Sequence, residues 1–441
     1  MGEIILRGGT ILTVDADSRV ESGDVACRDG LLVQVGGSYT PETGDYEIID
    51  ASGCVVMPGL VQSHVHMCQT LARGRAEDME LLDWLTGVVW PYEAALGVDD
   101  VAASARLACV ELLTGGTTAI LDMGTVRHTD ALFEAARDSG LRATIGKAMM
   151  DDADCPPGLR EGTTESLAES ARLLRDWHGR DGGRLRYAYA PRFVLSCTDD
   201  LLRETASAAR AAGVRIHTHA SENRSEVAEV VRRRGADNVV HLHRLGVSGR
   251  DVCLAHCVWL TDAERGVLRE TGTHLLHCPS SNLKLGSGIA PVPELLAEGV
   301  AVSLGADGAP CNNNLDGFLE MRLAALIHRP RRGPRALPGP EVVRMATMGG
   351  AAALGLQAEI GSLEVGKRAD VIAVDVRGAH VVPTADPHAA VVHACRASDV
   401  VDVVVDGRVV VRDRRLLTVD RDQVIADARE RAARVFARLA A

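Results

Sequence analysis

Residues that can hold a metal ion follow several short apolar runs of this sequence. His64 and His66 come after CVVMPGLVQ, and His219 comes after VRIHT. Asp307 follows the run VAVSLGA. Three imidazoles and one carboxylate can hold a divalent cation and still leave room for a water molecule. The four residues therefore predict the centre of a metal-dependent hydrolase.

The spacing of the histidines indicates which of them share a face. His64 and His66 are two residues apart on one predicted strand, so both imidazoles point to the same side. His219 has His217 two residues before it, and the spacing alone leaves open which of the two binds the metal. Asp307 lies in GADGAPCNNN, where it would also fit an ordinary turn. Only the companion histidines make it a ligand.

Two further polar residues could move protons beside this centre. Glu222 lies three residues after His219, where a carboxylate could shuttle protons to and from a water on the metal. The alternative is a glutamate favoured at a helix N-terminus by the macrodipole. His256 follows the apolar run VCLA and could orient the hydroxide, or it could be a buried imidazole satisfied by the backbone. We predict Glu222, His256 and Asp307 as catalytic residues.

Short apolar strands alternating with amphipathic helices would position these residues. Between residues 58 and 361, amphipathic segments such as 126–140, 164–178 and 200–212 separate eight expected strands. Eight strands with crossover helices are the number for a closed (β/α)8 barrel, whose functional residues lie at the carboxyl ends of the strands. An open doubly wound sheet is the alternative, but no Gly-rich phosphate loop follows the first strand. The expected strands are GLVQSHVH, TTAILDMG, RATIGKAMM, RLRYAYAPRF, VRIHTHA, VCLAHCV, THLLHCP and AVSLGAD.

The two ends of the chain show the pattern of short strands separated by turns. Residues 1–57 and the segment from residue 362 alternate apolar and polar residues between Gly and Asp turns, which predicts antiparallel hairpins. Asp406-Gly407 is a strong hairpin signal. We expect one small sheet domain assembled from both ends, with a helix over residues 420–440 packed on the outside.

Composition argues against several classes of protein. The formal charge is -12 and no basic stripe is found, so a nucleic-acid partner is not expected. Eleven cysteines without a CxxC pair indicate reduced, buried thiols in a cytoplasmic protein. The sequence opens without a signal peptide, and no run reaches the eighteen or so apolar residues that a membrane span takes.

Six motifs together resemble the deaminase and chlorohydrolase branch of the amidohydrolase superfamily. They are PGLVQSHVH, HTHASEN, LAHC, HCPSSNLKLGSG, LGADGAPCNNN and GSLEVGKRADV, spread over nearly the whole chain. The resemblance implies a distorted (β/α)8 barrel over residues 58–361 and a β-sandwich built from residues 1–57 and 362–441. It also implies a homo-oligomer and one divalent metal ion, Zn2+ or Fe2+. By the same resemblance, His64, His66, His219 and Asp307 match the metal ligands, while Glu222 and His256 match the acid/base and water-contacting residues.

The number of metal ions is also predicted from the resemblance. Relatives with two metals usually carry a modified lysine at the end of the fourth strand. In this chain that strand ends in Pro191-Arg192-Phe193, and Lys147 at the end of the third strand is the only other candidate. We therefore expect one metal ion.

Two groups of segments bear on the substrate. GKAMMDDAD, APRFVLSC and SENRSEV resemble guanine deaminases, which implies that Arg192 and Gln69 hold a purine. ARGRAEDMELLDWLTGVVWPYE and SNLKLGSGIAPVPELL look more like deaminases of S-adenosylhomocysteine, methylthioadenosine and 5′-deoxyadenosine, which often carry a His at the position of Arg192. Trp84, Trp90 and Trp259 could line an aromatic wall, although a Trp in this kind of helix more often belongs to the core, and we predict Trp90 as a substrate contact.

We expect hydrolytic removal of an exocyclic amine from a purine-type ring, with release of ammonia. Guanine and an adenine nucleoside both remain open as substrates. The nearest alternative is a chlorohydrolase or aminohydrolase of an s-triazine-type ring, because only the leaving group changes. A metal-binding scaffold without catalysis is a third possibility, but Glu222 and His256 would then have no role.

Overall fold

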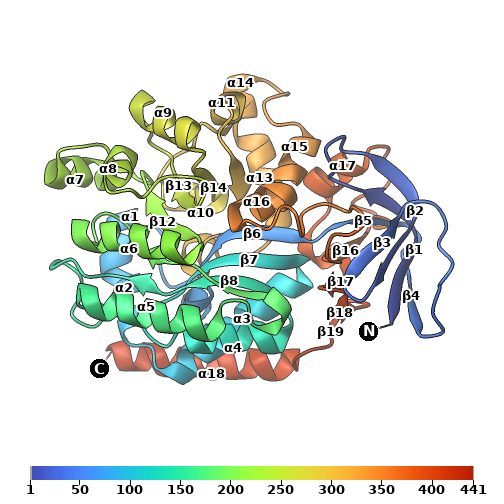
Figure 1. Cartoon of the computed structure of the whole chain (residues 1–441), viewed down its shortest axis with the longest axis horizontal. Coiled ribbons are helices and arrows are strands. Elements are labelled where there is room, and N and C mark those ends of the chain that lie inside the picture. Colours follow the sequence, from blue (N-terminus) through green and yellow to red (C-terminus); the bar gives the residue numbers. More distant parts are fainter. Residues whose placement is uncertain (1, 441) are drawn as a thin grey trace.

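The computed structural model describes residues 2–440, and it has two parts that lie side by side (Figure 1). A body of parallel strands and helices holds the middle of the chain, and a sheet built from both chain ends lies next to it. All eleven cysteines are free and buried, as the sequence predicts. Among residues 2–440, none of the helices has the length and apolarity needed to cross a membrane.

The body contains all eight expected strands, arranged in two parallel sheets. One sheet has the order β10 (Leu185–Tyr187), β8 (Arg142–Gly146), β7 (Thr117–Met123), β6 (Leu60–Val65). The other has the order β12 (Ile216–Ala220), β13 (Val252–His256), β14 (His274–His277), β15 (Val302–Leu304). Isolated parallel bridges join the two sheets at both edges, from Val65 to Asp307 and from Tyr189 to Ile216. A short parallel pair, β9 (Ala148–Met149) and β11 (Ala190–Pro191), follows β8 and β10.

The strands of the body are covered on both faces. Every residue of β6, β7, β8, β13 and β14 is buried. Parallel strands covered by helices are buried on both sides, which is why these segments read as nearly continuous apolar runs. Polar side chains at the ends of such strands are exceptions that need a partner or a function.

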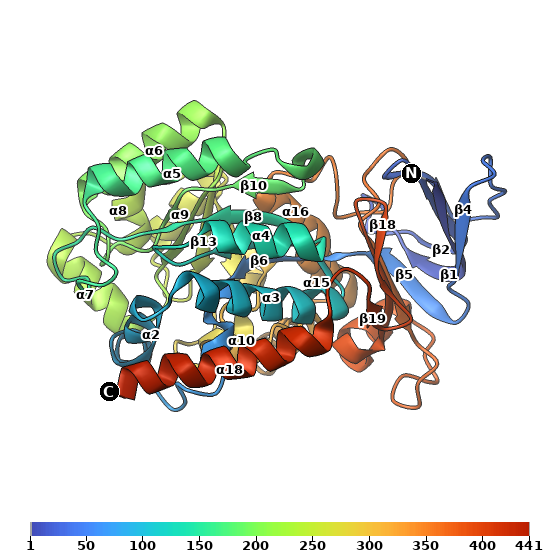
Figure 2. The ribbon, with the colours of Figure 1, turned by 90° about the horizontal axis from the view of Figure 1, so that it is seen from below.

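Helices connect successive strands and form the outside of the body (Figures 1 and 2). In α6 (Asp199–Ala212), the side chain of Thr198 accepts a hydrogen bond from the amide of Leu201 at 3.2 Å and caps the first turn. Gly213 ends this helix with φ of +68°, a conformation that favours glycine. The other helices around the strands are α3 (Val98–Thr114), α4 (Asp130–Ser139), α5 (Thr163–Trp177), α7 (Arg224–Arg234), α8 (Asn238–Arg244), α9 (Asp262–Thr271), α10 (Pro279–Lys284), α11 (Val292–Ala297), α12 (Ala309–Asn312), α13 (Gly317–Ile327), α14 (Arg329–Arg332), α15 (Gly339–Arg344) and α16 (Gly350–Leu354).

A separate helical segment follows β6 in the chain. It consists of α1 (Leu81–Trp84), a π-helical turn (Leu85–Val89) and α2 (Trp90–Ala94). The Oγ of Ser225 at the start of α7 donates a hydrogen bond to the carboxylate of Glu80, just before α1, at 2.9 Å. This contact holds the segment beside the carboxyl ends of the strands.

Nine strands from both chain ends form one hydrogen-bonded sheet. Its order is β19 (Arg415–Leu416), β18 (Arg408–Arg412), β17 (Val400–Val405), β16 (Val371–Asp375), β5 (Cys54–Pro58), β1 (Glu3–Leu12), β2 (Val20–Arg28), β3 (Leu31–Val35), and β4 (Tyr46–Asp50) pairs with β1. Asp406 and Gly407 form the predicted tight hairpin between β17 and β18, with φ of +54° and +70°. The prediction of hairpins throughout is wrong for β4 and β5, because both pair in parallel with β1. Alternating polarity shows that a strand has two faces, but it does not identify the neighbouring strand.

The strands β5 and β16 join the terminal sheet to the body. Val55 and Met57 of β5 face the core of the body, whereas Val56 faces the core of the terminal sheet. In the same way, Ile372 of β16 faces the body and Val371 faces the sheet. The pair is therefore buried on both sides, and β5 runs directly into β6, which carries the first histidine.

A buried ion pair reinforces this junction. Arg142, at the start of β8, donates two hydrogen bonds to Asp370, at 2.7 and 2.9 Å, and a third to Asp406 at 3.0 Å. The C-terminal helix α18 (Arg421–Ala440) lies on the outside of the body along α3, as predicted, and ends near α2 (Figure 2). A short helix, α17 (Pro387–Ala389), lies between β16 and β17 in the chain.

Candidate active site

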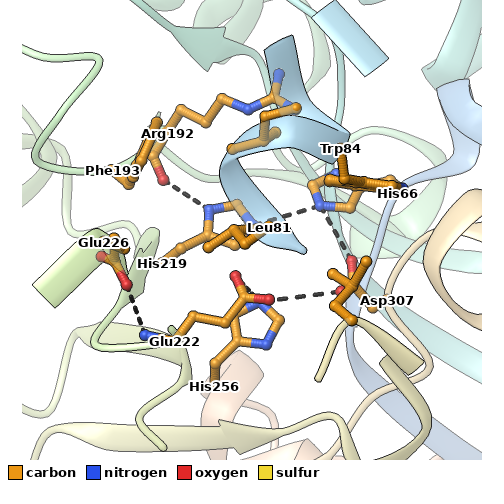
Figure 3. A pocket seen from close by; sticks show the side chains of 12 residues that line it. His66, Leu81, Trp84, Arg192, Phe193, His219, Glu222, Glu226, His256 and Asp307 are labelled. Carbon is orange, nitrogen blue, oxygen red and sulfur yellow. Dashed lines mark hydrogen bonds and ion pairs between the residues drawn. The ribbon is translucent and has the colours of Figure 1, made fainter. Parts of the chain in front are cut away.

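The four predicted metal ligands lie together at the carboxyl ends of the strands. The Nε2 atoms of His64 and His66 are 3.3 and 3.4 Å from Oδ1 of Asp307. The Nε2 atom of His219 lies 3.4 Å from Nε2 of His66. Figure 3 shows His66, His219 and Asp307 pointing toward one another. The bridge between Val65 and Asp307 brings the end of β6, with His64 and His66, next to Asp307, whereas His219 comes from β12 of the other sheet.

The outer nitrogens of the imidazoles fix the orientation of the rings. The Nδ1 of His66 donates to the carbonyl of Met123 at 2.7 Å, and the Nδ1 of His219 donates to the carbonyl of Arg192 at 2.6 Å. A carbonyl only accepts, so Nδ1 carries the hydrogen and each Nε2 presents a lone pair to the centre. The Nε2 of His64 has no hydrogen-bond partner although it is buried. This donor set fits a divalent cation.

The structure distinguishes His219 from His217. The Nε2 of His217 lies 2.7 Å from Nδ1 of His64, on the side away from Asp307, so His217 supports His64 from behind. Burial lowers the pKa of His219 well below its ordinary value, and burial followed by the charge of His64 lowers the pKa of His66 to about 3. Both rings are therefore neutral at pH 7, as metal ligation requires.

Asp307 is held as an anion by two donors. The Oγ of Ser281 donates to its Oδ2 at 2.6 Å, and the amide of Gly308 donates to its Oδ1 at 2.8 Å. Hydrogen bonds to a carboxylate favour its charged form. The backbone of Asp307 has φ of +63°, in the left-handed region that costs energy for a residue with a side chain. In this conformation the carboxylate faces His64 and His66.

Glu222 and His256 face the same centre, as predicted for the proton-transferring residues. Their side chains are 3.4 Å apart, from Oε2 to Nε2, and the Nε2 of His256 is 3.9 Å from Oδ2 of Asp307. The Nδ1 of His256 donates to Oδ1 of Asn282 at 2.9 Å. Burial, with the charge of Asp307 second, raises the pKa of Glu222 well above its ordinary value. A carboxyl whose pKa is raised in this direction is suited to take a proton and to give it back.

A second carboxylate, Glu226, lies behind Glu222 and was missed from the sequence. Its Oε2 accepts hydrogen bonds from the amides of Glu222 and Asn223, at 2.6 and 3.4 Å (Figure 3). Burial and the charge of Glu222 raise its pKa to about 7. The pattern Asn223-x-x-Glu226 is that of a helix capping box, which was the available signal. Glu226 fixes the backbone that carries Glu222.

These residues form the floor of a pocket. The helical segment over residues 81–94 closes one side of it. Beyond the polar floor, the pocket is lined by Leu81, Trp84, Leu85, Arg192, Phe193 and Leu285.

Of the three predicted substrate contacts, only Arg192 lines this pocket. Trp90 lies outside its lining and packs against Phe193, with ring centroids 6.5 Å apart, while Trp84 takes the place on the wall. Gln69 is fully buried and also lies outside the lining. A role of Gln69 and Trp90 in substrate binding therefore stays a prediction. Both residues would act indirectly, through the residues that line the pocket.

Glu93 of α2 joins two of these residues and was not found from the sequence. Its carboxylate accepts two hydrogen bonds from the guanidinium of Arg192, at 2.6 and 3.2 Å, and one from the amide of Gln69 at 2.8 Å. Arg192 and Glu93 are each 3% exposed. The charge of Arg192 is thus compensated inside the protein.

Lys147 does not reach the centre. Its ammonium forms an ion pair with Glu161 and donates to the carbonyl of Ala148 and the hydroxyl of Ser166, both at 3.2 Å. Within residues 2–440, both groups of three or more His, Cys, Asp or Glu side chains close enough to share an ion include His64. The arrangement agrees with one metal ion rather than two.

Comparisons with known proteins place the chain among enzymes of related chemistry. The Amidohydrolase family matches residues 55–410. A 5′-deoxyadenosine deaminase of Methanosarcina mazei is 40% identical over 441 residues, which covers 100% of both chains. A 5-methylthioadenosine/S-adenosylhomocysteine deaminase of Syntrophobacter fumaroxidans is 40% identical over 432 residues, which covers 97% of both chains.

Two solved structures share the fold over nearly the full length. An adenosine deaminase from Xanthomonas campestris with bound zinc has a TM-score of 0.93 and 30% identity, and the match covers 99% of both chains. An atrazine chlorohydrolase from Arthrobacter aurescens, complexed with zinc, has a TM-score of 0.92 and 28% identity over 97% of this chain and 100% of that one. With the family match and the full-length relatives, these similarities agree with the His/Asp centre and its neighbouring Glu222. The chain belongs to the amidohydrolase family.

Proposed function

We propose that this protein is a metal-dependent aminohydrolase that removes the exocyclic amine of an adenine nucleoside and releases ammonia. The observation that carries the proposal is the buried Glu222, placed against His256 beside the His/Asp centre. Ammonia leaves a ring only after it has gained a proton, and Glu222 is placed to supply one. Relatives at 40% identity over the full chain are named as deaminases of adenine nucleosides, which supports the same activity.

The metal ion would be held by the inward-facing nitrogens of three histidines and the carboxylate of Asp307. A bound divalent cation supplies a Lewis acid that lowers the pKa of a coordinated water toward neutrality. We propose Zn2+, because the solved relatives contain zinc, with Fe2+ as the alternative that the same donors allow. The ligands would be His64, His66, His219 and Asp307.

The chain's own residues account for the proton transfers. Water adds to the ring carbon that bears the amine, and Glu222 takes one proton from it and passes that proton to the adjacent ring nitrogen. The remaining proton of the added hydroxyl then moves to the amine, the C–N bond breaks, the ring carbon keeps the oxygen as a carbonyl, and ammonia leaves. His256, fixed through Asn282, steadies the oxygen that becomes the new carbonyl. The carboxyl of Glu222 thus acts first as base and then as acid.

The relatives favour an adenine nucleoside over guanine, because those at 40% identity are named as deaminases of adenine nucleosides. Arg192 does not decide between the two, since its hydrogen bonds to Glu93 use two of its five N–H donors. An s-triazine hydrolase remains the second candidate function, because the atrazine chlorohydrolase shares the fold with a TM-score of 0.92. Chloride needs no proton to leave, however, so that reaction would use Glu222 as a base and would not need it to protonate the leaving group.

The architecture completes the proposal. The family implies a TIM-barrel-like fold, and we propose that the two parallel sheets close through the Val65–Asp307 and Tyr189–Ile216 bridges into a distorted (β/α)8 barrel. The proposed boundaries are residues 58–361 for the barrel, and residues 1–57 and 362–441 for a β-sandwich with the C-terminal helix. A cytoplasmic homo-oligomer also stays part of the proposal, and sedimentation would measure its size.

Ammonia release by the zinc-loaded protein tests this function. We expect turnover of 5′-deoxyadenosine or 5′-methylthioadenosine well above that of guanine and of a chloro-s-triazine. Glu222→Gln should keep its metal and lose about 10²- to 10⁴-fold in kcat, because it cannot transfer the proton. Normal turnover by this variant, with its metal content intact, would remove Glu222 from the mechanism.

A further inference from the structure

The sequence identities of the relatives do not show which 5′ substituent of an adenine nucleoside the pocket accepts. The 5′-deoxyadenosine deaminase and the 5-methylthioadenosine/S-adenosylhomocysteine deaminase are equally similar to this chain, at 40% each. Their named substrates share an adenine nucleoside and differ at the 5′ carbon. That end carries a hydrogen, a methylthio group, or a thioether chain that ends in an amino acid. The side chains of the pocket wall must therefore discriminate between these 5′ substituents.

The walls beyond the metal centre are apolar. Leu81, Trp84 and Leu85 come from α1 and the π-helical turn, and Phe193 and Leu285 come from other segments of the body. All five side chains are buried in the described structure. In Figure 3, Leu81 and Trp84 lie over the histidines of the floor. A group that reaches past the ring therefore meets hydrocarbon, which suits a methyl or methylthio substituent.

The charged side chains of the lining are all engaged. Arg192 is paired with Glu93, so its positive charge is compensated. Glu226 accepts from the amides of Glu222 and Asn223 and from the side chain of Asn238. The remaining charged groups are those of the reaction centre. No lining residue offers an uncompensated cation to a carboxylate, and burying a carboxylate without one is strongly unfavourable.

We infer that the pocket selects adenine nucleosides whose 5′ end is small and uncharged, and that it discriminates against S-adenosylhomocysteine. The inference rests on the proposed deaminase function and narrows its substrate class. The discriminating residues are Leu81, Trp84, Leu85, Phe193 and Leu285.

One cation near the reaction centre could act against this selection. Arg224, two residues after Glu222, is exposed and lies over the ring of Trp259, 4.0 Å from the ring centroid. It is not part of the pocket lining. If the amino-acid tail of S-adenosylhomocysteine left the pocket at this point, Arg224 would be the group to bind its carboxylate. Arg224→Ala therefore serves as the control.

The test compares kcat/KM for 5′-deoxyadenosine, 5′-methylthioadenosine and S-adenosylhomocysteine on the zinc-loaded protein. We expect the first two within about tenfold of each other and S-adenosylhomocysteine at least 100-fold lower. Arg224→Ala should leave all three values unchanged. Equal turnover of S-adenosylhomocysteine, or a loss confined to that substrate in Arg224→Ala, would overturn the selection but leave the deaminase function standing. If the zinc-loaded protein turned over none of the three substrates, both the proposed function and this inference would be overturned.

A gain of charge provides an independent readout. Leu85→Arg should raise the ratio of S-adenosylhomocysteine to 5′-deoxyadenosine turnover at least tenfold, because it supplies the missing cation. Leu85→Gln is polar but uncharged and should not raise this ratio. Each ratio is measured on a single variant, so a lower folded fraction cancels from it. An equal rise in both variants would show that the wall discriminates by polarity rather than by charge, against the inference.

Discussion

The buried contact between Glu93 and Arg192 predicts a large loss of stability in Glu93→Ala. The substitution removes three hydrogen bonds and leaves the guanidinium of Arg192 without a counter-charge. Both side chains are 3% exposed, so water compensates little of this loss. Breaking a buried ion pair by removing one partner typically costs about 3–5 kcal/mol. We expect the free energy of unfolding to fall by about that amount.

Urea unfolding followed by tryptophan fluorescence would measure this change, because Trp90 lies in the same short helix as Glu93. The control is the double variant Glu93→Leu/Arg192→Met, which removes both charges and keeps apolar volume. It should recover most of the stability, since replacing a buried pair by apolar residues is often neutral. A loss below about 1 kcal/mol in Glu93→Ala would refute the reasoning. So would a double variant less stable than Glu93→Ala.

Three other predictions follow from the structure. Burial raises the pKa of Glu320 to about 7 from 4.5, so the folded protein holds this proton and loses up to about 3 kcal/mol of stability as the pH rises through that window. Glu320→Gln should lower this slope, in unfolding curves recorded between pH 4.5 and 7.5, by the share of one group, because the pKa values of Glu226 and Asp122 are also raised to about 7 and their shares remain. An unchanged slope would assign all of it to these other groups. Removing the metal with a chelator should abolish turnover and lower the melting temperature, and His66→Ala should bind no metal by elemental analysis; activity retained in either case would contradict the ligand assignment. Trp84→Ala should raise KM for an adenine nucleoside about tenfold, since an aromatic contact contributes on the order of 1 kcal/mol, whereas Trp90→Ala should change KM less.

The strand-end residues could be predicted because parallel strands deliver their carboxyl ends to one place. His64 and His66 needed only the pattern of apolar runs and their spacing, whereas Asp307 also needed the companion histidines, and the eight strands followed from the same apolar pattern. The choice between His217 and His219 could not be made, because both point to the same side of β12. The choice depends on how deeply each imidazole lies in the body, which is set by the neighbouring strands.

The residues of the pocket wall could not be predicted from the periodicity of the sequence. Trp84 and Trp90 are separated by the π-helical turn over Leu85–Val89, which adds a residue to a turn and shifts the helix phase. The sequence alone therefore does not tell which of the two tryptophans faces the pocket. Glu93 could not be found either, because its partners Gln69 and Arg192 are 24 and 99 residues away in the chain.

The pairing of β5 with β16 has a consequence for how the chain is made. Pro58 pairs with Val371, so one edge of β5 stays without its partner until roughly 300 further residues have been synthesised. At about 5–20 residues per second, this interval lasts on the order of 15–60 s. Throughout it, an apolar strand that leads directly into the first histidine-bearing strand presents an open edge to other nascent chains. Slow translation of the second half, or loss of residues 371–375, should therefore show first as aggregation of newly made protein rather than as an inactive soluble enzyme.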